Sequence, residues 1–354
     1  MLPLHVDALP YATRAVPLVV RAHAARPASP ISSHALTVDG QAVQELVIDL
    51  HAPDIEAKPA IANHRLGTTA SLAAIAAQNH AVAAINGTFF DAGGDNFPAG
   101  AIELNGAFAF NARGTLLGFG ANGQVTMLRA AEALSLDVDD PSNSTSAMWP
   151  WYLNRPSTNP MRVDVLTPYF GPETRDPSAL VAQVVGGKVT AIHPGITPIP
   201  PDGYDIEIGA GEAKTPIATR VHVGDPAVLT DTVLALPSEK PVPFAAYPNA
   251  MGAGPMLVQN GRIDVEPSLE GLDEPDILNA ETLRSVVGID RAGHLIFLTI
   301  HEANVWQEAS IAKALGLWDA MNLDGGSSVG LWYEGRYLTP PKRALATAIV
   351  VVQR

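Results

Sequence analysis

The sequence of 354 residues contains no cysteine, and only 16% of its residues are charged. Without cysteine the chain has no disulfide scaffold, no thiolate nucleophile and no zinc–thiolate site. Positive charge is scarce, because 22 Lys and Arg stand against 36 Asp and Glu and leave a net charge of −14. This balance disfavours nucleic acid or an anionic membrane as a partner. An anionic substrate would have to be held by local positive groups acting against the overall field.

Long apolar runs are also lacking. No segment reaches the roughly eighteen residues needed to cross a bilayer, so no membrane span is expected. The first 26 residues do not combine a basic start with a continuous apolar stretch, because Pro3, Pro10 and Pro17 interrupt them. We expect a bacterial protein that is secreted or periplasmic, with its signal absent from this sequence. A cytoplasmic protein is the alternative.

Apolar residues make up 47% of the chain, which is ample for a large core, and 30 Gly and 30 Pro are spread along it. This composition favours a loop-rich, β-dominated protein over a helical bundle. We predict an α+β fold of mixed, largely antiparallel sheets with a few flanking helices. Residues 1–33 are expected to form an N-terminal arm. Residues 34–354 are expected to form one catalytic-type domain, with a β-rich central insertion over about 150–245.

The most informative stretch lies near the end of the chain. Residues 308–315 have helical character, residues 317–323 are predicted to form a buried strand, and Asp324-Gly325-Gly326-Ser327-Ser328 follows. Glycines allow positive φ and close backbone approach, so this turn could direct amide N–H groups at a ligand beside Asp324. An ordinary Asp-Gly hairpin turn would explain the first two residues but not the following Gly-Ser-Ser.

A second unit of the same design occurs early in the chain. Residues 69–79 are alanine-rich and helix-like, with Thr68 or Thr69 as the N-cap, and an apolar strand is predicted over 81–85. The polar run Asn86-Gly87-Thr88-Phe89-Phe90-Asp91 then follows. We predict that the two strand ends lie side by side in one sheet and form a single pocket, with Asn86 and Asp324 within about 15 Å, or three strand spacings.

Short apolar runs separated by turn residues predict the remaining strands. They cover residues 36–38, 43–50, 101–104, 108–110, 116–119, 125–128, 181–185, 189–193, 284–289, 294–300 and 346–351.

Several other side chains are candidates for chemistry. Arg284 opens a buried strand, where a guanidinium suits bidentate binding of phosphate or carboxylate, although an ion pair with Asp290 or a nearby acid is an equal alternative. His301 follows another strand, and Arg155 lies in a polar loop and could supply a second cation. No Gly-x-Ser-x-Gly elbow surrounds Ser327 and Ser328, so they are better candidates for binding an anion or a sugar than for nucleophiles.

Four motifs occur in an order that resembles the phosphodiester glycosidase family. They are Asn86–Asp91 (NGTFFD), Gly254–Gly261 (GPMLVQNG), Arg284–Asp290 (RSVVGID) and Asn322–Ser328 (NLDGGSS). The similarity extends from about Val43 to the terminal strand. The sequence departs from the family at Thr88, where Gly is common, and at His301-Glu302, where Asp-Gly is frequent.

The resemblance implies a hydrolase that cleaves the glycosidic bond of a sugar-1-phosphodiester and releases free sugar and a phosphomonoester. Under this hypothesis Asp324 is the carboxylate that activates water or stabilises positive charge on the sugar. Arg284 and the amides of Gly325 to Ser327 bind phosphate, and Asn86 orients the sugar or the water. Asp91 and His301 are secondary catalytic candidates. Other substrate-binding candidates are Gly87, Arg155, Asn322, Gly325, Gly326, Ser327 and Ser328.

Two other functions remain open at this point. A metal-dependent phosphodiesterase would use Asp324, Asp91, Asn86 and a serine hydroxyl as ligands for Mg²⁺ or Ca²⁺. A carbohydrate-binding or envelope protein would keep the fold without catalysis. The hydrolase hypothesis requires no cofactor and no protein metal site, and its expected partner is a sugar-phosphate diester or a phosphorylated glycan.

Overall fold

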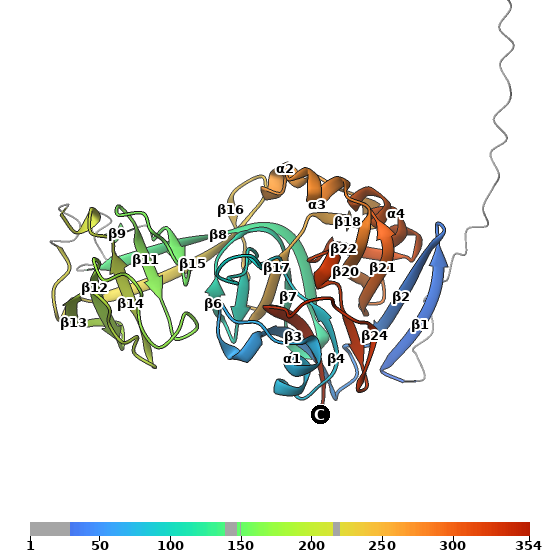
Figure 1. Ribbon diagram of the computed structural model, residues 1–354, viewed down its shortest axis with the longest axis horizontal. Coiled ribbons are helices and arrows are strands. Elements are labelled where there is room, and N and C mark those ends of the chain that lie inside the picture. Colours follow the sequence, from blue (N-terminus) through green and yellow to red (C-terminus); the bar gives the residue numbers. More distant parts are fainter. Residues whose placement is uncertain (1–28, 139–146, 149, 215–219) are drawn as a thin grey trace, which may run out of the picture.

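The computed structural model describes residues 29–354, except 139–146, 149 and 215–219. Most of the predicted N-terminal arm therefore lies outside the described residues, and the first strand begins at Ile31. The chain forms a body and a distal lobe, which is carried on a long two-stranded ribbon (Figure 1). Largely antiparallel sheets with few helices confirm the predicted fold class.

The body contains a seven-stranded sheet, in which all neighbouring strands are antiparallel. Its order is β1 (Ile31–Val38), β2 (Gln41–Ile48), β21 (Leu295–Ala303), β20 (Thr282–Asp290), β22 (Leu317–Asn322), β18 (Met256–Gln259) and β19 (Arg262–Ile263). The turns after Val38 and Asp290 are those expected from the sequence.

A five-stranded sheet lies against the first one. Its order is β24 (Arg336–Thr339), β23 (Leu331–Tyr333), β4 (Ala81–Asn86), β25 (Thr347–Gln353) and β3 (Ile55–Ile61). Alternate residues of these strands face opposite sides, as a pleated strand requires. Ile349 and Val351 enter the core between the two sheets, whereas Ala348 and Val350 face the helix on the outside.

Two helices cover the outer faces of these sheets. α1 (Leu72–Gln78) packs on the five-stranded sheet and α4 (Val305–Ala314) on the seven-stranded one. The predicted N-cap of α1 at Thr68 or Thr69 is wrong, because the Ser71 side chain accepts the hydrogen bond from Ala74 N. α4 begins three residues before the predicted start, since Asn304 and Gln307 form a capping box.

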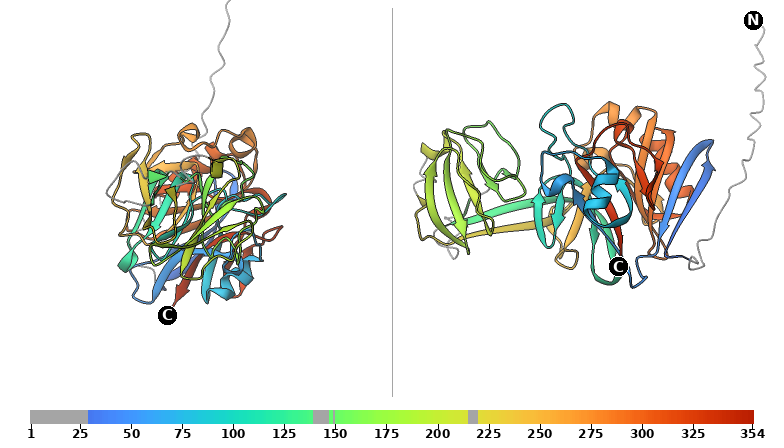
Figure 2. Two further views of the ribbon diagram at one scale, coloured as in Figure 1. Left: turned by 90° about the vertical axis from the view of Figure 1, so that its left-hand side faces the viewer. Right: turned by 60° about the horizontal axis from the view of Figure 1, so that its bottom comes forward.

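The ribbon connects the body to the lobe (Figure 2). β8 (Val125–Val138) and β15 (Ala227–Ala235) form it, so the strand predicted over 125–128 continues about ten residues further than expected. Their sheet also holds β16 (Lys240–Pro241), β7 (Arg113–Phe119), β17 (Asn249–Ala253), β5 (Ile102–Leu104) and β6 (Ala107–Phe110), and β9 (Ala147–Met148) pairs with β8. The lobe sheet is β10 (Tyr152–Leu153), β11 (Val163–Leu166), β14 (Gly203–Ile208), β12 (Leu180–Val185) and β13 (Lys188–Pro194).

Short helical turns complete the described elements. The α-helical ones are α2 (Pro267–Glu270) and α3 (Pro275–Asn279). The 3-10 turns are η1 (Ala62–His64), η2 (Ala121–Gly123), η3 (Glu212–Lys214) and η5 (Gly326–Ser328).

Candidate active site

The two polar strand ends meet in the structure. Asn86 Nδ2 donates to the carbonyl oxygen of Asp324 at 2.8 Å, and Asp324 N donates to Gly87 O at 3.1 Å. The predicted proximity of Asn86 and Asp324 is therefore confirmed. The prediction that both strands share one sheet is wrong, because β4 belongs to the five-stranded sheet and β22 to the seven-stranded one. The two sheets stack face to face, and the strand ends meet across the interface between them.

Gly87 allows the backbones to come this close. A Cβ on this residue would lie 2.4 Å from Thr347 Oγ1 and 2.9 Å from Met251 Sδ. Gly87 N and Thr88 N donate to the carbonyl and the hydroxyl oxygen of Thr347, respectively. Thr88, which replaces a common family glycine, does not have positive φ, so its side chain is compatible with the backbone here. Gly87 thus shapes the site by packing rather than through a side chain.

Hydrogen bonds from the Asn86 side chain connect three segments of the chain. Besides its bond to Asp324, its Oδ1 accepts from Ser285 Oγ at 2.6 Å and from Gly330 N at 3.0 Å. The residue is only 1% exposed. These contacts make Asn86 a positioning residue that joins β4, β20 and the chain after η5.

Replacing Asn86 with Ala should therefore lower stability strongly. The change leaves the Asp324 carbonyl, the Gly330 amide and the Ser285 hydroxyl without their shared partner, and the free energy of unfolding should fall by about 3 kcal/mol or more. Urea denaturation measures this loss. Ser285→Ala removes one of the three bonds and should cost only about 1 kcal/mol. Equal stability of Asn86→Ala and the native chain would contradict the structural role.

Asp324 carries the carboxylate at the centre of the site. Arg343 Nη2 lies 3.1 Å from Asp324 Oδ2, and Arg343 Nε donates to Ser328 Oγ at 2.7 Å. The Arg343 guanidinium carbon also lies 4.9 Å from the centre of the Phe90 ring. The Asp324 side chain is 10% exposed and that of Arg343 is 36% exposed, so Arg343 is the member of the pair that is accessible to solvent.

The pKa of Asp324 reflects this mixed environment. Burial raises it above the ordinary value of an aspartate. A hydrogen bond from Ser328, the charge and hydrogen bond of Arg343, and the amide of Gly325 oppose the increase. The carboxylate is therefore held in a poorly solvated position, where its charge depends on the neighbouring guanidinium.

The turn after Asp324 presents backbone amides. Gly326 has φ +60°, a left-handed conformation that suits glycine. Within η5 the amides of Ser328 and Val329 bond to Gly325 O and Gly326 O. Within the described chain the amides of Gly326 and Ser327 have no hydrogen-bond acceptor. Free N–H groups at the start of such a turn suit an anion.

Arg284 lies beneath this turn. It is 2% exposed, and its Nε and Nη2 donate to Ala303 O and Ala280 O at 2.9 and 2.7 Å. Its Nη1 is 3.6 Å from the position that a Cβ would take on Gly325. The alternative ion pair with Asp290 is not formed, because Asp290 instead bonds His294 at the far end of β20.

A second buried charge accompanies Arg284. Glu308 on α4 is fully buried, and neither carboxyl oxygen has a hydrogen-bond partner among the described residues. Burial raises the pKa of Glu308 well above its usual range, and the positive charge of Arg284 opposes this. Burial likewise lowers the pKa of Arg284, with Glu308 opposing. The guanidinium thus contributes positive potential from below the turn, with its direct contacts mostly to carbonyls.

Arg343 is the site residue that the sequence analysis missed. It precedes β25 in the run Lys342-Arg343, outside all four motifs, and Lys342 N donates to Ser327 O at 2.8 Å. The available signal was the scarcity of basic residues, which makes two adjacent cations before a core strand unusual. Lys342 and Arg343 come near Asp324 because the chain turns back through β23 and β24.

The other predicted residues occupy varied positions. Asp91 is exposed in the loop after β4, one residue beyond Phe90, and His301 is exposed on β21. Asn322 is buried, and its Nδ2 donates to Gly254 O at 2.8 Å. Arg155 lies over the Phe110 and Tyr152 rings in another part of the fold. No contact in the described part of the chain joins Arg155 to Asp324.

Metal ligands are not gathered at this site. Over the described ranges, no group of three or more His, Asp or Glu side chains is arranged to hold a metal ion. In the same part of the chain, no helix has the length and apolar character to cross a membrane.

A carboxylate, a guanidinium and backbone amides without an acceptor in the described chain lie together where the ends of β4 and β22 meet. Residues 178–352 match the model of the phosphodiester glycosidase family. The resemblance indicated by the sequence motifs is thereby confirmed. Three of the four motifs lie inside the matched segment, and Asn86–Asp91 lies before it.

Solved structures share the fold. A hypothetical protein from Synechocystis is 26% identical, with a TM-score of 0.78; the match covers 92% of this chain and 62% of that one. A protein from Burkholderia pseudomallei that is described as exported is 20% identical, with a TM-score of 0.70 and coverage of 88% and 74%. The zebrafish N-acetylglucosamine-1-phosphodiester alpha-N-acetylglucosaminidase catalytic domain is 13% identical, with a TM-score of 0.47 and coverage of 92% and 82%. No curated protein is significantly similar in sequence.

Proposed function

We propose that this protein hydrolyses the glycosidic bond of a sugar-1-phosphodiester, releasing free sugar and a phosphomonoester. The family match supports a phosphodiester glycosidase, and the chemistry suits the residues present. The leaving group is a phosphomonoester, which is a weak base, so its departure depends little on a strong general acid. The reaction instead requires donors near the growing negative charge and a carboxylate near the sugar.

Asp324 is the proposed catalytic carboxylate. It would stabilise positive charge on the sugar ring or accept a proton from the attacking water. Arg343 has a double role, because its bond to Asp324 Oδ2 favours the ionised carboxylate while more than a third of its side chain remains exposed. The exposed part is available to the phosphate oxygens. Ser328 fixes the guanidinium by accepting from Nε.

The phosphate would lie over the turn that follows Asp324. The amides of Gly326 and Ser327 supply hydrogen bonds there, and buried Arg284 supplies positive potential from the other side of Gly325. In a protein with a net charge of −14, these local groups must offset the overall repulsion of an anion. Asn86 acts indirectly by holding the Asp324 backbone.

One observation carries this proposal: the contact between the ends of β4 and β22, with Arg343 on the Asp324 carboxylate. It brings residues 238 positions apart in the sequence into one hydrogen bond. A purely structural aspartate would not require a cation with more than a third of its side chain exposed beside free backbone amides.

The decisive experiment offers the protein a set of sugar-1-phosphodiesters in ¹⁸O-labelled water. We expect NMR to show free sugar and a phosphomonoester, with the label at C1 of the sugar. Label in the phosphate would mean that phosphorus is attacked and would overturn the glycosidase proposal. The same assay with EDTA should retain activity, since the proposed roles need no metal; loss restored by Mg²⁺ or Ca²⁺ would favour the metal-dependent phosphodiesterase instead.

We also propose an extracytoplasmic location. Fold similarity to a protein described as exported supports it. Fractionation of cells that make the native protein tests it, and recovery solely with cytoplasmic markers would contradict it.

A further inference from the structure

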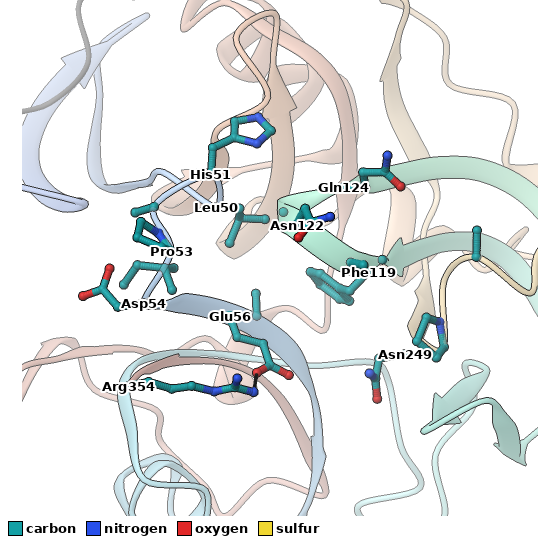
Figure 3. Close-up of a pocket in the computed structure, with 18 of the residues that line it drawn as sticks. Leu50, His51, Pro53, Asp54, Glu56, Phe119, Asn122, Gln124, Asn249 and Arg354 are labelled. Atoms are coloured by element: carbon teal, nitrogen blue, oxygen red, sulfur yellow. Dashed lines mark hydrogen bonds and ion pairs between the residues drawn. The ribbon is translucent and has the colours of Figure 1, made fainter.

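A pocket of about 750 Å³ is lined by Arg354 and by residues such as Glu56 and Phe119 (Figure 3). It lies at the opposite end of the five-stranded sheet from Asp324. β25 links the two places, because Thr347 at its start contacts Gly87 and Arg354, just after its end, lines the pocket. The strand has seven residues, so the separation is about 24 Å at 3.4 Å per residue. The pocket is therefore separate from the candidate active site.

Segments distant in sequence form its walls. They are the loop between β2 and β3, the turn between β7 and β8, the segment before β17, and the residue after β25. Two walls touch directly, because a Cβ on Gly123 would lie 2.2 Å from Leu50 O. The pocket is thus built by packed backbone and does not depend on one loop.

Three residues with neutral amide side chains line the pocket: Asn122, Gln124 and Asn249. Asn249 Oδ1 accepts from Asn105 N at 3.1 Å, but its Nδ2 has no hydrogen-bond partner in the described chain. The exposed side-chain amides of Asn122 and Gln124 also make no hydrogen bonds to the described residues. Amides combine donors and acceptors, so this lining can satisfy a ligand that carries both.

The charged lining groups disfavour an anion. Glu56 forms an ion pair with Arg354, and Asp54 accepts from Gln353 Nε2 at 2.7 Å. The pocket therefore holds two carboxylates and one guanidinium. Phe119 is an aromatic lining residue, but it is only 4% exposed and therefore offers little ring surface for stacking.

We propose that this pocket is a second binding site, which takes a neutral saccharide unit. Sugar hydroxyls both donate and accept hydrogen bonds, and the side-chain amide groups that have no partner in the described chain can do the same. The pocket also has the size of a typical small-ligand site. The anionic reacting group would go to the Asp324 turn. The second site would hold an uncharged part of a glycan at the other end of the sheet.

Calorimetric titration of the full chain with maltotetraose, cellotetraose, xylotetraose and chitotetraose tests this proposal. At least one should bind, and Gln124→Ala combined with Asn122→Gly should weaken its binding about tenfold, as loss of about 1.4 kcal/mol requires. Gly preserves the turn, because Asn122 has φ +55°. Inorganic phosphate should not compete for this site.

Two control variants separate this site from the active site. Asn260→Gly removes a comparable exposed amide at φ +51° in a different turn and should leave tetrasaccharide binding unchanged. Asp324→Asn should also leave it unchanged, whatever that variant does to hydrolysis. The proposal is overturned if the native chain binds none of the four sugars, or if the double variant binds as tightly as the native chain.

Discussion

Asp324→Asn should lower kcat/KM for a sugar-1-phosphodiester by about 10²–10³-fold, the usual effect of removing one electrostatic contact to a transition state. The amide keeps the shape of the side chain but cannot carry the negative charge. Initial-rate measurements at several substrate concentrations test this result. The expected loss lies mainly in kcat, because under the proposed mechanism the carboxylate acts on charge that develops during the reaction.

The same Asp324→Asn change should not lower the stability of the folded chain, although it lowers activity. Folding raises the pKa of Asp324 through burial, so the folded chain holds this proton more tightly than the unfolded chain. Above the unfolded pKa the ionised carboxylate therefore costs stability, and neutral Asn should leave the melting temperature unchanged or higher. Asp319→Asn is a matched control on the same strand, since burial also raises the pKa of Asp319. Near-native activity of Asp324→Asn would show that the carboxylate has no catalytic role.

Arg343→Ala should reduce kcat/KM by about 10²-fold and also change the pH profile. The guanidinium lowers the pKa of Asp324 against the effect of burial. Without it that pKa rises further, so a higher pH is needed to ionise the carboxylate. If the reaction requires the ionised form, the acidic limb of kcat/KM moves to higher pH. A pH series from acid to neutral measures the displacement.

Two variants make this result specific. Arg343→Lys keeps a positive charge but loses the two-pronged contact with Asp324 and Ser328, so intermediate activity and a smaller displacement are expected. Arg336→Ala removes one exposed positive charge on β24 and should keep the native profile. A loss of rate in Arg343→Ala with an unmoved acidic limb would mean that Arg343 does not control the charge of Asp324.

Local sequence patterns predicted several parts of this fold well. The hairpin around Asp39-Gly40 and the hairpin around Gly186-Gly187 form as expected, because left-handed turn residues and alternating strands are properties of neighbouring residues. The start of α1 was misplaced because several adjacent hydroxyl residues could serve as the cap. The long ribbon was missed since β8 is supported along its length by β15, about a hundred residues later.

The sequence by itself determined the predominance of β-structure, the two polar strand ends, the central role expected of Asp324 and the resemblance to phosphodiester glycosidases. These depend on short-range patterns and on motifs that stay within a few residues. Tertiary structure decided that the strand ends meet across two sheets, that the Asn86 side chain connects separate segments through hydrogen bonds, and that Arg343 pairs with Asp324. Those contacts join distant segments through sheet stacking, and no local pattern specifies which distant side chain will fill a given position.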